Sequence, residues 1–372
     1  MPEFEKWWND PKKHCKRLDY WLPHWKALAA RIGDRRARYF TLCARSMIDV
    51  FLLVKEGLLQ LDPENDSIGS VQFCECDQEQ FDEITDIVAR EDAGFFGRLE
   101  NIVLFEDSDF TAQFPTLDSI AIKLEDERLQ EDYAKIDQLQ LKRTFISIQS
   151  SFPYDYVNLD FCEYYYPEPP GMLRINKTVE RFLDWQRRPM VIEDEKPAPI
   201  SEFVMTVTCR HDAEFPEPAE ARLAALIKEN CASSAQYREQ LEQTRHVVNI
   251  EEWIQRNKED FFFAGWPKDI ARAARDYGWE MEILDYVYYR RTGDEQNPYA
   301  IACLVAKFSR ADPQPNYISA ALYALQEKNR KLIGDIDRGS SEGRKLLANL
   351  TEIVALRNEQ AKRKQRPELP DP

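Results

Sequence analysis

Acidic side chains recur where the strands expected from this sequence end, and acids placed in this way can bind ligands. Glu75 and Asp77 close the run SVQFCECD, Asp107 closes ENIVLFED, and Asp160 lies within YDYVNLDFCEYYYP. In open α/β sheets, ligands bind beyond the carboxyl ends of the strands. Two or more carboxylates that converge there would hold Mg²⁺ or Mn²⁺ and support metal-dependent hydrolysis of phosphodiesters.

The same acids have a plainer interpretation as capping residues, because negative charge is favourable in the first turn of a helix. Asp77 directly precedes the helical run QEQF, so capping accounts for it as well as ligand binding does. Asp160 lies between Leu159 and Phe161 within a strand, where a carboxylate needs a polar partner. Capping therefore explains Asp160 less well than it explains Asp77.

A second group of reactive residues ends the fifth expected strand, where Cys209, Arg210 and His211 follow one another. His211 is the histidine best placed at the ligand edge and could act as a base, while Arg210 could pair with one of the acids. A solvated loop histidine is the alternative. Cys43 and Cys162 have no neighbouring histidine, so we interpret them as small core residues rather than nucleophiles.

The segments that must position these residues alternate between strand and helix patterns. The expected strands are 38–44, 70–77, 100–107, 154–167 and 202–210, and the expected helices include 46–61, 78–91, 175–188 and 219–231. Such alternation predicts a mostly parallel sheet with helices on both faces, a Rossmann-like α/β fold. Residues 279–310 then predict two strands joined by a turn, which would add an antiparallel hairpin to the sheet.

Helical segments flank this core on both sides. Residues 12–32 have helical spacing, with a start or a kink expected at Pro23, and residues 316–365 predict one or two further helices. We therefore expect an N-terminal helical segment, a Rossmann-like domain and a C-terminal helical extension with a basic tail, at residues 1–37, 38–310 and 311–372.

Charge is distributed unevenly along the chain, which carries a formal net charge of -16. Residues 1–45 hold 11 Lys and Arg against 5 Asp and Glu, residues 326–366 hold 11 against 6, and the stretch between them is strongly acidic. An acidic body does not indicate a general binder of duplex DNA, which would need a basic face. The two basic ends could meet and form a local patch, but solvated helix faces are the plainer interpretation.

The composition of the chain also indicates the cellular compartment in which we expect it. The 8 cysteines show no zinc-site spacing, and we expect free thiols in a reducing compartment. No apolar run reaches the roughly 20 residues of a membrane span, and the N-terminal run lacks the features of a signal peptide. The expectation is a cytoplasmic protein without membrane contact.

The run KKHCKRLDYWLPHWKALAARIGDRRARYFTLCA, residues 12–44, resembles the opening of the three-Cys-motif partner protein family and its methyltransferase-like relatives. Those proteins begin with a helix containing Lys and His, a Trp-bearing stretch, and a strand reading roughly Tyr-Ile-Asp-Gly-Phe-Ala-Gly. Residues 39–45 here read Tyr-Phe-Thr-Leu-Cys-Ala-Arg, and VNLDFCE and VMTVTCR are similar to the fourth and fifth strands. The resemblance covers roughly residues 12–310 and implies a class I methyltransferase-like fold.

The resemblance implies S-adenosylmethionine (SAM) as the cofactor. Thr41 and Cys43 would lie beside it at the end of the first strand. Glu75 or Asp77 would accept hydrogen bonds from the ribose hydroxyls, and Asp107 would accept one from the adenine amino group.

The same resemblance implies a target site around the fourth strand. Asn158, Asp160 and the tyrosines at 164–166 would lie where a base or side chain is methylated, with Tyr164 as one candidate and His211 nearby. An aromatic ring there could stack on a flipped base. The target would then be nucleic acid.

The glycine loop of the family pattern is absent, however. Thr41, Leu42 and Arg45 stand where the family has Asp and glycines, and a Cβ at those positions blocks close approach of a cofactor. Three functions stay open. One is a divergent SAM-dependent methyltransferase in a prokaryotic defence or mobile-element context, as the resemblance implies. The second is a non-catalytic protein that binds a protein partner or a second copy through its C-terminal helices, and the third is the metal-dependent hydrolase.

Overall fold

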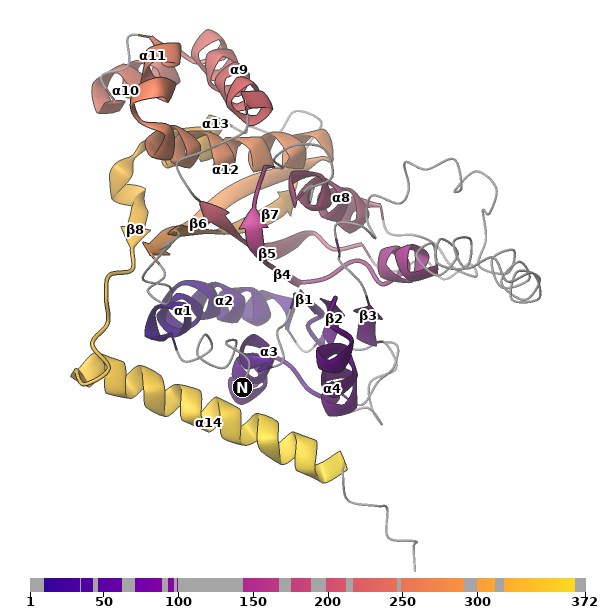
Figure 1. The fold of residues 1–372 in the computed structure, drawn as a ribbon. Helices are drawn as coiled ribbons and strands as arrows, with labels where there is room; N and C mark the ends of the chain where they lie inside the picture. The colour runs from indigo at the N-terminus through magenta and orange to yellow at the C-terminus, as the bar shows by residue number, and fades with distance from the viewer. Residues whose placement is uncertain are drawn as a thin grey trace, which may run out of the picture.

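Strands from most of the chain join in one sheet in the computed structural model of this protein (Figure 1). The structure describes residues 10–33, 35–42, 46–61, 71–88, 93–96, 99, 143–166, 175–188, 199–211, 217–245, 249–290, 300–311 and 318–364. The strands in these ranges are β1 (Tyr39–Thr41), β2 (Val71–Glu75), β3 (Gly94–Phe96), β4 (Tyr156–Tyr164), β5 (Glu202–His211), β6 (Trp279–Arg290), β7 (Ala300–Arg310) and β8 (Arg330–Leu332). Their order across the sheet is β3-β2-β1-β4-β5-β7-β6-β8.

The strands are mostly parallel. β1 pairs in parallel with both β2 and β4, and the β2–β3, β4–β5 and β6–β8 pairs are parallel as well. β7 is antiparallel to its two neighbours, β5 and β6. This arrangement confirms the predicted Rossmann-like α/β class and the antiparallel pair over residues 279–310. The strand order reverses between β1 and β4, which is the point where ligands bind in open sheets of this kind.

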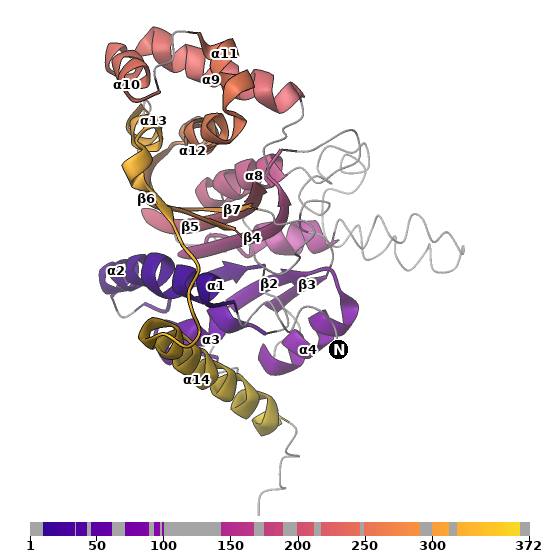
Figure 2. The same cartoon turned by 60° about the vertical axis from the view of Figure 1, so that its left-hand side comes forward.

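Helices cover both faces of the sheet (Figures 1 and 2). One face is covered by α1 (Pro11–Cys15), the π-helix η2 (Lys16–Trp21), α2 (Leu22–Ile32), α3 (Ile48–Lys55) and α4 (Gln78–Val88), with α14 (Ser341–Lys364) outside them. The other face is covered by a helix at 143–150, α8 (Ile175–Arg187) and α12 (Lys258–Asp276), with α9 (Glu217–Ser233), α10 (Ala235–Arg245), α11 (Ile250–Arg256) and α13 (Ile318–Leu325) packed around α12.

The α-helix α2 begins at Leu22, so the helix start predicted at Pro23 is confirmed to within one residue. Pro23 lies in the first turn of α2, where a missing backbone N–H costs no helical hydrogen bond. The turn before it widens into η2, and the Leu22 N–H donates to the Arg17 carbonyl. Such π turns are rare and often occur at functional sites.

Both terminal segments share a hydrophobic core with the sheet. Trp21 and Trp25 are fully buried against Tyr39 and Tyr156 of the strands, and the aromatic ring centroids of Trp25 and Tyr39 are 5.5 Å apart. The apolar residues Leu346, Leu350 and Ile353 of α14 join the same core. The two segments expected as extensions therefore form layers on the central sheet.

Several boundaries differ from the predictions. β1 has 3 residues, shorter than the expected 38–44. β3 and β8 were not predicted, because a strand of 3 residues is too short to show a two-residue alternation. The strand expected at 100–107 lies outside the described residues. Within the described part of the chain, no helix is both long and apolar enough to cross a membrane.

Candidate functional site at the carboxyl edge of the sheet

Polar side chains gather on one face of the sheet where β1, β4 and β5 end. Thr41 is paired with Asn158 across β1 and β4, and Asp160 is paired with Thr208 across β4 and β5. Because side chains alternate along a strand, Asn158 and Asp160 project from the same face. That face is covered by α1, η2 and α3, so the predicted residues Thr41, Asn158 and Asp160 do lie together.

A buried carboxylate that the sequence analysis missed, Asp49, joins the ends of β1 and β4. Its Oδ2 accepts hydrogen bonds from Tyr39 Oη at 2.6 Å, Thr41 Oγ1 at 2.7 Å and Asn158 Nδ2 at 3.0 Å. Burial and the neighbouring Asp49 carboxylate raise the pKa of Tyr39 well above its usual value, so Tyr39 stays a donor. The signal was an acid within the apolar helical run IDVFLLVK, where an acid needs a polar partner.

One buried acceptor atom beside the Asp49 network has no hydrogen bond to a described residue. Asn158 is 2% exposed, and its Nδ2 must point to Asp49 because a carboxylate only accepts. Its Oδ1 is buried and accepts no hydrogen bond from any described residue. Buried polar atoms are normally satisfied, so an N–H or O–H donor of a ligand fits this position.

The acids at the end of β2 bond to nearby backbone. Glu75 Oε1 accepts from the N–H groups of Cys76 at 2.7 Å and Asp77 at 3.0 Å. Asp77 Oδ1 accepts from the N–H of Gln80 at 2.9 Å, so Asp77 caps α4. The capping interpretation of Asp77 is confirmed. Both backbone bonds to Glu75 use Oε1, and the side chain of Cys76 also hydrogen-bonds to the Glu75 carboxylate.

Asp160 is held by lysines of the N-terminal helices. Lys13 Nζ lies 3.2 Å from Oδ2 of Asp160, and Lys16 Nζ lies 3.8 Å from Oδ1. Burial alone would raise the pKa of Asp160, but Lys13, Lys16 and Arg17 together hold it well below the usual range. Asp160 therefore stays ionised at neutral pH and forms ion pairs with the lysines of the N-terminal helices.

His211 lies on the opposite face of the sheet from Asp160. Asp160 is paired with Thr208, and along β5 the side chain of Arg210 shares the face of Thr208, so that of the next residue, His211, projects from the other face. It is 2% exposed and stacks on Phe262, with ring centroids 4.4 Å apart, while Phe263 meets it edge-on at 4.7 Å. The expectation of a solvated loop histidine is wrong, because α12 covers this end of β5. The sequence grouped His211 with Asp160, and the structure separates them.

The tyrosine run after β4 also turns to the α12 face. Tyr165 and Tyr166 are 2% and 4% exposed, and Tyr166 Oη donates to Asp269 Oδ2 at 3.0 Å. Their rings pack in the core and do not form an open surface for a flipped base. The side chains of Tyr164 and Cys162 lie outside the described residues, as do Cys43 and Asp107.

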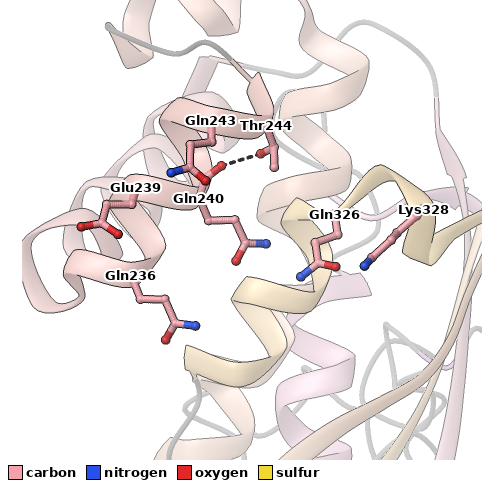
Figure 3. Close-up of a pocket in the computed structure, with 7 residues that line it drawn as sticks. All are labelled: Gln236, Glu239, Gln240, Gln243, Thr244, Gln326 and Lys328. Atoms are coloured by element: carbon pink, nitrogen blue, oxygen red, sulfur yellow. Dashed lines mark hydrogen bonds between the residues drawn. The ribbon is translucent and has the colours of Figure 1, made fainter.

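A separate groove lies on the far side of the helical layer, between α10 and the residues after α13 (Figure 3). It has a volume of about 590 Å³ and is lined by Gln236, Glu239, Gln240, Gln243, Thr244, Gln326 and Lys328. Gln240 also donates to the Leu322 carbonyl at 3.0 Å. None of the strand-end residues lines this groove, so it is distinct from the carboxyl edge.

The described residues show no metal-binding group, and comparison of the chain with known proteins finds no relative. Among the described ranges, no group of three or more His, Cys, Asp or Glu side chains is arranged to hold a metal ion. No family model, curated protein or solved structure matches this chain.

Proposed function

We propose that this chain is a divergent methyltransferase-like protein that binds SAM at the carboxyl edge between β1 and β4. The observation that carries the proposal is the sheet itself, in which an antiparallel hairpin, β6 and β7, follows five parallel strands and β7 pairs with β5. Such a hairpin is the added feature of class I methyltransferases among doubly wound folds, and it agrees with the resemblance of residues 12–44.

The strand-end residues fit part of such a cofactor. The family pattern has an Asp where this chain has Thr41, and Asp49 of α3 brings a carboxylate within 2.7 Å of the Thr41 hydroxyl. Oδ1 of Asn158, which has no partner among the described residues, would accept from a donor of the ligand, and the carboxylate of Glu75 would accept from ribose hydroxyls. When bound, SAM supplies an electrophilic methyl group. Asp49 and Asn158 would orient the ligand, and the target would be nucleic acid.

A second candidate is a non-catalytic interaction protein on the same fold. It is favoured because the strand-end acids are engaged within the chain: Asp160 by two lysines, Asp77 by the start of α4, and Asp49 by three donors. A chain that had lost methyl transfer would be free to satisfy its acids internally in this way.

Calorimetric titration of the full chain with SAM and with S-adenosylhomocysteine tests the proposal. We expect heat from both ligands and an affinity about tenfold lower in Glu75→Gln, since a charge-assisted hydrogen bond to ribose is lost. The exposed acid Glu359 of α14 provides a matched control, Glu359→Gln, which should bind as the wild type does.

Absence of heat at millimolar ligand would contradict the cofactor proposal and leave the interaction protein. Binding without transfer of labelled methyl groups to DNA or RNA would keep the cofactor site and reject nucleic acid as the target.

A further inference from the structure

Three cations of the N-terminal helices form a buried basic cluster, defined here as Lys13, Lys16 and Arg17. Lys16 is 0% exposed and Arg17 is 6% exposed, whereas the Lys13 side chain is 26% exposed. The cluster lies against the carboxyl ends of β4 and β5, where Lys16 Nζ is 3.3 Å from Thr208 Oγ1. These cations are not the solvated helix face that the sequence favoured.

Arg17 is the unusual member of this cluster. Its Nε and Nη1 are buried and have no hydrogen-bond partner among the described residues, and no described carboxylate forms an ion pair with it, although its charge helps lower the pKa of Asp160. A guanidinium stays charged at every physiological pH, so burial cannot neutralise it. Buried charges are almost always paired, which makes an unpaired one a mark of a missing anionic partner.

The neighbouring acids do not balance the cluster. Asp160 is the carboxylate that touches it, and that one group is shared by Lys13 and Lys16. Asp10 caps α1 by accepting from the N–H of Lys12, and Asp19 accepts from the thiol of Cys15. Among the described residues the three cations therefore share one contacting carboxylate, Asp160, and burial lowers the pKa of Lys16.

We propose that the buried basic cluster binds the phosphate group of a small phosphate monoester. A phosphate monoester carries close to two negative charges at neutral pH, which complements a cluster with more cations than contacting carboxylates, and guanidinium donors suit its oxygens. A polynucleotide fits less well, since its backbone is read along an extended basic track and this chain has a net charge of -16.

The position of the cluster separates it from the proposed cofactor site. Its contacts, Asp160 and Thr208, lie on β4 and β5, beyond the point where strand order reverses. Arg17 and Lys16 belong to the π turn η2, which moves them off a regular helical register. The inference does not depend on SAM binding.

Equilibrium dialysis of the full chain with radiolabelled inorganic phosphate and ribose 5-phosphate tests the proposal, since neither probe contains adenosine. We expect both to bind and to lose at least about tenfold in affinity in Arg17→Gln. The exposed Arg256 of α11 provides the matched control, Arg256→Gln, which should bind normally.

Lys13→Gln is the second variant, in case Arg17→Gln does not fold, and it should weaken both probes as well. The proposal is overturned if the wild type retains neither probe or if neither variant weakens them. It is also overturned if the substitutions weaken only an unphosphorylated single-stranded oligonucleotide, or only SAM. The last outcome would assign the cluster to the carboxylate of the cofactor, and the calorimetric result above would still stand by itself.

Discussion

At the carboxyl edge, the two faces of the sheet carry very different side chains. On the face of α1 and α3, the strand ends carry Thr41, Asn158 and Asp160, and the buried Asn158 Oδ1 and Arg17 Nε and Nη1 have no hydrogen-bond partner among the described residues. On the face of α12, His211 and the two tyrosines are enclosed by aromatic rings. Buried polar atoms without a hydrogen bond to a described residue occur on both faces, since Trp266 Nε1 and Tyr286 Oη lie beside α12, so the faces differ in their charges. On the α12 face Arg222 pairs with Asp269 and Arg330 pairs with Asp260, whereas Arg17 has no such pair among the described residues. The difference assigns binding to the first face and stability to the second.

The largest expected effect comes from the α12 face. Phe262 is 2% exposed and stacks on both His211 and Trp266. Phe262→Ala should lower the free energy of unfolding by about 3–5 kcal/mol, because a large ring leaves a cavity. Urea denaturation measures this, with Leu332→Ala as the control, since Leu332 is 58% exposed. A weaker affinity for SAM or phosphate in folded Phe262→Ala would contradict the assignment of ligand binding to the face of α1 and α3 alone.

Asp49 should give the largest stability effect on the ligand face. Asp49→Ala leaves the buried donors of Tyr39, Thr41 and Asn158 without an acceptor, and we expect a loss of about 3 kcal/mol. Asp86→Ala, an exposed acid of α4, is the control for urea denaturation. A loss below about 1 kcal/mol would mean that Asp49 does not hold the ends of β1 and β4 together.

Part of the loss of folding stability at acid pH should also arise on the ligand face, from protonation of His14. Burial and the Arg17 guanidinium lower the pKa of His14 from 6.5 to about 4, while its Nε2 lies 3.1 Å from Asn349 Oδ1 of α14. Between these values the unfolded chain binds the proton and the folded chain does not. The stabilisation from neutral His14 is thus complete above pH 6.5 and is lost as the pH falls toward 4, at most about 3 kcal/mol.

Denaturation midpoints at pH 7 and pH 4.5 measure this dependence. His14→Gln keeps an N–H donor for Asn349 but cannot titrate, so its midpoint should fall less than that of the wild type. Equal falls in the two proteins would assign the acid sensitivity to other groups. Because the two curves share all other titrating residues, their difference isolates His14.

Much of the fold could be predicted because its long elements have strong patterns. The runs that became β4, β5, β6 and β7 are long and rich in aromatic and β-branched residues, and the helix at 175–187 is clearly amphipathic. β3 and β8 were not predicted, because three residues are too few to show a periodic pattern. In addition, β8 reads Arg-Lys-Leu and lies at an edge of the sheet, where polar residues are tolerated.

The site was predicted less well because its partners are distant in the sequence. Asp160 needed a cation, and the sequence offered Arg210, but the structure supplies Lys13 and Lys16 from the other end of the domain. His211 and Asp160 were grouped because both end strands. Which face each one takes depends on the pairing register between β4 and β5, and register is set by tertiary packing.

Hydrogen exchange of the full chain with and without saturating SAM tests the division of the faces most directly. We expect slower exchange in peptides covering residues 39–42, 46–55, 71–77 and 156–161, and unchanged exchange across α12 at 258–276. Protection concentrated in α12 and at the end of β5, or no protection anywhere, would contradict it.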